Sequence, residues 1–172
     1  CLIFNEGCGS GDSDLDYPAY FYDLLIDLND SCLSGLYNKL DSSFGGVRSS
    51  LINWVNRTFG TGGNLHLRIK DGERFSNADK FADWGEGRYP GTYIIRIDDS
   101  KLVNASQEFK ALVILHEIYH GYLEINGLSV LTTNDHNLFN KYRERMADQM
   151  QIAFPNLSRG DALDLTWAGL QS

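Results

Sequence analysis

The segment from about Asn104 to Glu124 restricts most strongly how this chain can fold. Its apolar residues do not form a single stripe, because they wrap most of the circumference of a helix. They are Phe109, Leu112, Val113, Leu115 and Ile118, with Ser106 and Gln107 near the start. A helix that is apolar nearly all round has to be enclosed by other elements. We therefore expect this helix to be central and buried.

Two helices and two strands are expected before this segment. Apolar residues at spacings of three and four predict a helix from Asp30 to about Phe44 and another within 47–59, forming a helical hairpin. The alternation in NLHLRIK predicts a half-buried strand over 65–70, and TYIIRID predicts a more buried strand over 92–98. The stretch 71–90 reads as a loop. The run 17–28 fits a helix and an extended segment equally well.

Two further helices are expected after the central one, so the predicted class is α+β with N-terminal helices and a small mixed or antiparallel sheet. The first runs from Asp135 to about Phe154 and is stopped by Pro155. The second opens with Ser158 followed by Asp161, which is close to a capping box. Leu157 and Ala162 are spaced for a hydrophobic staple at the same helix start.

Length and charge favour one acidic domain. The chain has 172 residues, a net charge of −8 and scattered Lys and Arg residues, so it has no basic stripe for a nucleic-acid backbone. No apolar run approaches the roughly 18 residues that span a bilayer. We expect a flexible N-terminal tail over 1–16 and one soluble domain over 17–172, monomeric by default and without direct nucleic-acid binding.

The N-terminal residue is a cysteine that precedes an acidic, Gly/Ser-rich segment. This pattern fits a domain excised from a longer chain, and it also fits a processed bacterial lipoprotein that is attached to a membrane only through a lipidated Cys1. Cys8 and Cys32 would form a disulfide in an exported protein, which leaves Cys1 over. An exported or cell-surface location in a bacterium is expected, and a cytoplasmic one stays open.

The central helix carries the motif HEIYH, with His116 and His120 four residues apart and Glu117 beside the first. Residues at i and i+4 share one helix face, so both imidazoles can reach one ion. Catalytic zinc takes three protein ligands and a water, whose proton an adjacent glutamate accepts during attack on a carbonyl. The motif predicts a Zn²⁺ site with Glu117 as general base. The alternative is that both imidazoles simply pack or face solvent.

The third ligand is predicted to be His136, which opens the helix after the following loop. Asp135, Glu144 and Asp148 are the competitors, because zinc also accepts a carboxylate. The remaining histidine, His66, lies on the polar face of the first predicted strand, where a solvated side chain is the simpler interpretation.

The segment HEIYHGYLE, a loop and DHNLFNKYRERM together resemble the zincin-type metallopeptidases, and among them the SprT-like group. In that group a third histidine opens the next helix and an aromatic residue follows three positions on, as His136 and Phe139 do here. The resemblance covers roughly Asn104 to Met150. The chain is also similar to small HExxH domains at the C-termini of exported bacterial proteins, with a similar LTWAGL segment. Gly121 departs from the alanine common after the second histidine, and no glycine follows His136.

The resemblance implies a minimal zincin fold, in which an edge strand lies over the active-site helix. A protein or peptide substrate would pair with that strand and be hydrolysed. Tyr119, Tyr142 and Arg143 are candidates for an oxyanion donor, but none of them is assigned as a site residue. Glu124 and Asp148 are candidates for orienting a ligand histidine. No zinc ribbon or DNA-binding segment is seen, so a DNA-repair role is not implied.

Two other functions fit the same residues. The scaffold would serve binding or assembly if the zinc were a structural staple. The chain would otherwise be the toxic peptidase domain of a larger delivered protein. The sequence contains no marker of a substrate-specificity pocket, so the peptide that would be cleaved is not predicted.

Overall fold

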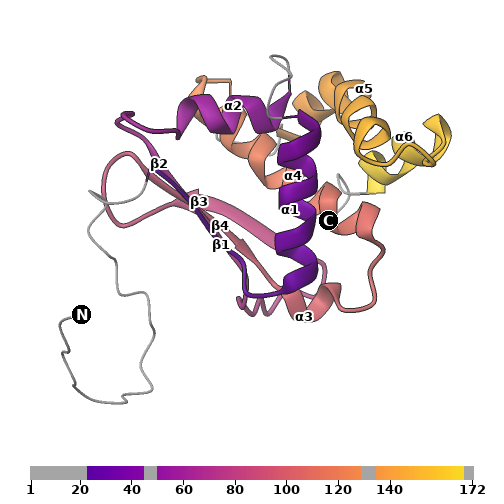
Figure 1. Ribbon diagram of the computed structural model, residues 1–172, viewed down its shortest axis with the longest axis horizontal. Helices are drawn as coiled ribbons and strands as arrows, with labels where there is room; N and C mark the ends of the chain where they lie inside the picture. The colour runs from indigo at the N-terminus through magenta and orange to yellow at the C-terminus, as the bar shows by residue number, and fades with distance from the viewer. Residues whose placement is uncertain (1–22, 45–49, 129–134, 169–172) are drawn as a thin grey trace.

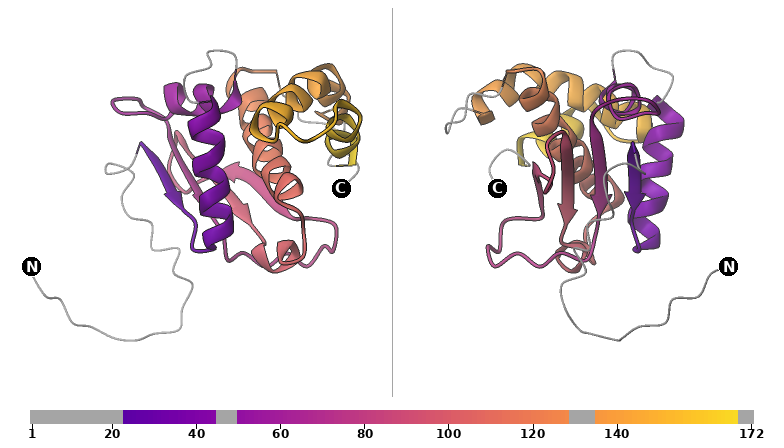
Figure 2. Two further views of the ribbon diagram at one scale, coloured as in Figure 1. Left: turned by 45° about the vertical axis from the view of Figure 1, so that its right-hand side comes forward. Right: turned by 90° about the vertical axis from the view of Figure 1, so that its left-hand side faces the viewer.

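The chain forms a four-stranded mixed sheet with helices packed on one face, in a computed structural model that describes residues 23–44, 50–128 and 135–168. For residues 44, 135–142 and 167–168 the description covers the backbone alone. The right-hand view of Figure 2 shows the strands in front of the helices. In Figure 1, α5 and α6 form an outer layer beyond α4. The α+β class predicted from the sequence is confirmed.

Among the described elements, all four strands and two helices come in the first part of the chain, and only helices follow β4. The elements are β1 (Leu24–Asp27), α1 (Ser31–Phe44), α2 (Leu51–Thr58), β2 (His66–Lys70), β3 (Ala82–Glu86), β4 (Thr92–Ile97), α3 (Asp99–Leu102), α4 (Gln107–Ile125), α5 (Asp135–Ala153) and α6 (Arg159–Ala168). The sheet order is β1-β2-β4-β3. Strands β1, β2 and β4 are parallel to one another, whereas β3 runs antiparallel to β4 at the edge.

Most predicted elements are present near their expected bounds, including both predicted strands and the helices α1, α2, α4, α5 and α6. The Ser158 cap is also present, because its Oγ accepts the Asp161 N–H at 3.1 Å. The interpretation of 71–90 as a loop is wrong in part, since β3 lies within it. β1 lies in the run 17–28, for which no prediction was possible, and it precedes the helical hairpin. The tail predicted over 1–16, with Cys1 and Cys8, lies outside the described residues.

The core is built around α4, which is central and buried as predicted. The inner face of the sheet contributes Leu67, Ile69, Ile95 and Ile97, all at most 2% exposed. Each fully buried side chain of this size contributes roughly 1.5–3 kcal/mol relative to an exposed one. Eleven residues of α4 are buried, among them Leu112, Leu115, Ile118 and Leu123. Within the described ranges, no helix combines the length and apolar character that crossing a membrane requires.

Buried carboxylates fix the connections between strands and helices. Asp71, at the end of β2, accepts the backbone N–H groups of Asn29 and Asp30 at 3.0 and 2.6 Å, which holds the start of α1 beside β2. Asp98 follows β4 and is 1% exposed. It accepts the Phe75 N–H at 3.0 Å and so holds the segment that leads into β3.

Lys101 completes the same connection from α3. Its ammonium donates to three backbone carbonyls of the segment before β3, those of Phe75, Asn77 and Lys80. It also lies 3.6 Å from a carboxylate oxygen of Asp98. Charge-assisted hydrogen bonds are about twice as strong as neutral ones, so this pair gives an irregular segment a defined course. The entry of the chain into β3 is therefore set by the end of β4.

These contacts make the stability of the fold depend on pH. Burial alone would raise the pKa of Asp98, but hydrogen bonds from Ser100 and Phe75, with the charges of Lys101 and Arg74, hold that pKa below its ordinary value. A folded-state pKa below the unfolded value contributes stability above about pH 4, and this stability is lost as the pH falls.

We predict that Asp98→Asn lowers the free energy of unfolding by about 1–3 kcal/mol at neutral pH, because the charge-assisted bonds weaken. The gap between wild type and variant should narrow below about pH 4, where the wild-type carboxylate also becomes protonated. Urea unfolding at several pH values measures both effects. Asp79→Asn, an exposed change in the same segment, should stay within about 0.5 kcal/mol of wild type. If the difference in unfolding free energy between wild type and Asp98→Asn stayed constant down to pH 3, the stabilising role of the Asp98 carboxylate would be contradicted.

Candidate metal centre

α4 leaves its two histidines less covered than the residues around them. His116 and His120 are half-buried, while the neighbouring Leu115, Glu117 and Tyr119 are buried. The helix starts cleanly, because the Ser106 side chain accepts the Phe109 N–H at 3.2 Å. The HEIYH motif therefore sits in the second half of a well-anchored helix, with both imidazoles on one flank.

The two imidazoles face each other through the same ring atom. The Nε2 atoms of His116 and His120 lie 3.0 Å apart, and the ring centroids are separated by 4.7 Å with planes at 73°. Two nitrogens bound at about 2.0–2.1 Å to one tetrahedral zinc ion would lie roughly 3.3 Å apart. The observed separation needs to grow by only a few tenths of an ångström. The pair therefore fits two ligand positions of a single ion.

Glu117 lies beside the pair and is 8% exposed. Burial, together with the nearby negative charge of Asp83, raises the pKa of this carboxyl to about 8. A hydrogen bond from the Trp84 backbone N–H and the charge of Lys80 act in the opposite direction. A divalent cation next to Glu117 would also favour the carboxylate form. The side chain can therefore exchange a proton near neutral pH.

Trp84 of β3 packs directly over the motif. A Cβ added to Gly121 would lie only 2.4 to 2.7 Å from three atoms of the indole ring, so no larger residue fits there. The indole Nε1–H donates to the Glu124 carboxylate at 2.8 Å, and the ring stacks on Tyr93 at a centroid distance of 5.1 Å. This packing explains why position 121 is occupied by glycine.

β3 forms an edge of the described sheet, since it pairs with β4 on one side only. Its Asp83 carboxylate contacts Lys80 at 2.6 Å and Arg96 at 3.2 Å. β3 packs beside α4 (Figure 1), and the contact between Trp84 and Gly121 joins them. The edge strand thus meets α4 at Glu117 and Gly121.

The four candidates for the third metal ligand lie in different surroundings. His136 and Asp135 lie in the first turn of α5, but their side chains are outside the description. Glu144 and Asp148 both pair with Arg159 of α6, Asp148 at 2.8 Å, and their side chains are largely exposed at 68% and 63%. Those two carboxylates are engaged away from the histidine pair. Among the side chains that are described, no three His, Cys, Asp or Glu groups gather as metal ligands.

The other side chains considered from the sequence have contacts of their own. Glu124 binds the Trp84 indole, and Arg143 donates to the Leu163 carbonyl at 2.9 and 3.0 Å. His66 lies on β2 with its Nδ1 3.8 Å from an Asp23 oxygen, so it is not brought to the histidine pair. Tyr142 lies outside the described side chains.

Sequence reasoning missed Trp84 and Asp83, which lie nearest the motif on the strand side. The only available signal was the short alternation of Ala82 and Trp84 with Asp83 and Gly85. Five residues of this kind, flanked by glycines and charges, do not stand out from a polar loop. The strand is defined by its ladder to β4 and by the contact with Gly121.

No family model, no curated protein and no solved structure matches this chain. The interpretation of the site therefore depends on the residues and their geometry.

The contact between Trp84 and Gly121 yields a prediction with a matched control. Gly121→Ala should lower the free energy of unfolding by about 1–3 kcal/mol, because the added methyl group overlaps the indole ring. Gly35→Ala, in α1 with no atom within 4 Å of the added Cβ, should raise it by roughly 0.5–1 kcal/mol through helix propensity. Urea unfolding of the two variants measures the difference.

A second variant tests the cause of the loss. If the clash with Trp84 is responsible, adding Trp84→Leu to Gly121→Ala should cost less than the sum of the two separate changes. Strictly additive effects would show that the indole ring is not what excludes the methyl group.

Proposed function

We propose that this chain is a zinc-dependent peptidase of the zincin type, with His116, His120 and His136 as metal ligands and Glu117 as general base. The observation that carries the proposal is the pair of facing Nε2 atoms, 3.0 Å apart on one helix flank, with a buried glutamate beside them. An i, i+4 histidine pair of this kind with an adjacent glutamate is the ligand and base arrangement of HExxH peptidases.

Each residue of the motif has a distinct task in this proposal. Zinc, when bound, supplies a Lewis acid that polarises the scissile carbonyl and acidifies a water. His116 and His120 hold the ion from half-buried positions that the rest of α4 keeps fixed. Glu117 receives a proton at its carboxylate and later delivers it to the leaving amine. Burial raises the pKa of this carboxyl, and a bound cation would offset part of that rise and favour the carboxylate that accepts the proton.

The edge strand suits an extended peptide as substrate. β3 pairs with β4 on one side only within the described sheet, so a peptide can add to its other edge through main-chain hydrogen bonds. Trp84 holds this strand against α4. A peptide paired there would pass close to Glu117 and the histidine pair. Binding of this kind depends little on side-chain identity, which is consistent with a broad class of peptide substrates.

The coordination chemistry favours a catalytic site over a structural staple. Structural zinc sites are closed by four protein ligands, while catalytic sites use three and keep one position open. The described residues around α4 supply two histidines, and the competing carboxylates Glu144 and Asp148 are paired with Arg159 instead. His136 would complete a set of three.

The proposed zinc site predicts the metal content of the protein. Wild-type protein dialysed against metal-free buffer should retain close to one zinc ion per chain, and His136→Ala should lose most of it, because two histidines alone bind zinc weakly. His66→Ala is the control and should keep wild-type zinc. Elemental analysis of the three proteins provides the measurement. Zinc retained by His136→Ala would move the third ligand elsewhere, and no zinc in wild type after its addition would overturn the proposal.

The second prediction separates binding from chemistry. Glu117→Gln should keep the metal and lower kcat/KM on a quenched-fluorescent peptide library by about a hundredfold to ten-thousandfold, because an amide cannot accept the proton. Glu108→Gln, on the first turn of the same helix, should leave both quantities unchanged. Cleavage by Glu117→Gln at the wild-type rate would show that this carboxylate is not the base.

A further inference from the structure

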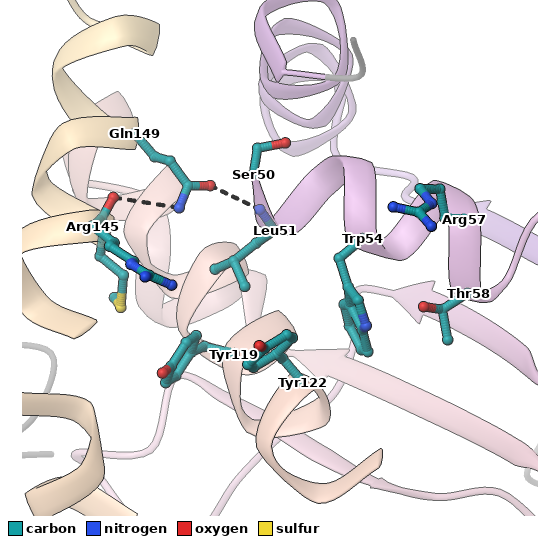
Figure 3. A pocket seen from close by; sticks show the side chains of 10 residues that line it. Ser50, Leu51, Trp54, Arg57, Thr58, Tyr119, Tyr122, Arg145 and Gln149 are labelled. Carbon is teal, nitrogen blue, oxygen red and sulfur yellow. Dashed lines mark hydrogen bonds between the residues drawn. The ribbon is translucent and has the colours of Figure 1, made fainter. Parts of the chain in front are cut away.

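A second candidate binding site lies on another flank of α4. A cavity of about 370 Å³ opens between α2, α4 and α5, within the range of volumes found for small-molecule sites. Figure 3 shows α2 above it, α5 at one end and two tyrosine rings of α4 below. The residues that carry the argument are Trp54, Arg57, Tyr119, Tyr122, Arg145 and Gln149.

This cavity is distinct from the histidine pair. Successive residues of an α-helix are rotated by about 100°. Tyr122 therefore lies about 120° around α4 from His116 and about 160° from His120, whereas Tyr119 lies about 60° and about 100° from them. Both tyrosines line the cavity, whereas neither histidine of the pair nor Glu117 is among its lining residues. A ligand in the cavity would therefore contact neither the proposed metal ligands nor Glu117.

The walls are aromatic and held in place. Tyr122 packs edge-on against Trp54 at a centroid distance of 5.4 Å and stacks on Tyr119 at 5.8 Å. Gln149 is 8% exposed, and its Oε1 accepts the Leu51 N–H at 3.1 Å, which ties α5 to the start of α2. The cavity therefore has a preformed surface of aromatic faces, suited to a flat apolar body.

The charge of the lining is unusual for this chain. The protein carries a net charge of −8, yet the cavity is lined by two arginines and by no carboxylate. Figure 3 shows Arg57 on α2 and Arg145 on α5 at opposite ends of the cavity, with Trp54 between them. Arg57 makes no ion pair with any residue of the described ranges. Two separated guanidinium groups suit a ligand with an anionic group at each end.

We propose that this cavity binds a small, elongated organic acid, with a carboxylate at each end and an apolar or aromatic body between them. The body would lie against Trp54 and Tyr122, and the carboxylates would reach Arg57 and Arg145. A small ligand is favoured over an acidic polymer because the net negative charge of the protein repels a polyanion. The cavity volume sets the same limit.

The test uses three matched probes and isothermal titration calorimetry on the full chain. para-Phenylenediacetate has both carboxylates, para-tolylacetate has one, and para-phenylenediacetamide has none. The expected order of affinity is dianion, monoanion, diamide. Arg57→Gln and Arg145→Gln should each lower the affinity for the dianion by about tenfold, to the affinity that the wild type has for the monoanion. Arg88→Gln, between β3 and β4, is the control and should not change its affinity.

Carboxylates also bind zinc, so the titration is repeated with His120→Ala. Unchanged affinity of the dianion for that variant would place it in the cavity, whatever the outcome for the peptidase proposal. Lost affinity would show that the probe binds a metal at the histidine pair and would overturn the assignment. Three other outcomes would also overturn the proposal. They are equal affinity for dianion and diamide, no binding of the dianion, and unaltered affinity for the dianion in both arginine variants.

Discussion

The need to enclose α4 organises this protein. Its apolar side chains extend around most of the helix, so no single neighbour can remove them from water. The inner face of the sheet covers one side, α1 and α2 a second, and α5 a third, as Figure 1 and Figure 2 show. The flank that carries His116 and His120 stays half-buried. The same requirement that builds the core thus leaves two imidazoles accessible on a rigid support.

The Trp84–Gly121 contact links this core to the chemistry of the motif. An edge strand has a ladder on one side only, and here a side chain fixes it to the helix instead of a second strand. The contact brings a backbone N–H to Glu117, whose burial would otherwise be more costly. A glycine after the second histidine is therefore part of the site, because any Cβ would separate the strand from the helix.

The sequence was sufficient where a pattern is long and periodic. α1, α4 and α5 each span several helical turns, and β2 and β4 alternate clearly, so their types and approximate ends could be predicted. β1 and β3 have four and five residues, and their stability comes from neighbours distant in sequence. The histidine spacing predicted two imidazoles on one helix flank, and the structure places them there. The arrangement around Glu117 was not predictable, because Trp84 and Asp83 approach it only through the sheet.

Helical periodicity also explains how one short segment can face two different environments. In HEIYHGY the spacing of four aligns His116 with His120, while the spacing of three aligns Tyr119 with Tyr122 on another flank. The first pair brings two Nε2 atoms within 3.0 Å of each other, and the second forms a wall of the cavity under α2. The same buried residues of α4 fix the helix and therefore the positions of both pairs. A core helix whose flanks have different surroundings can therefore support two sites without a longer chain.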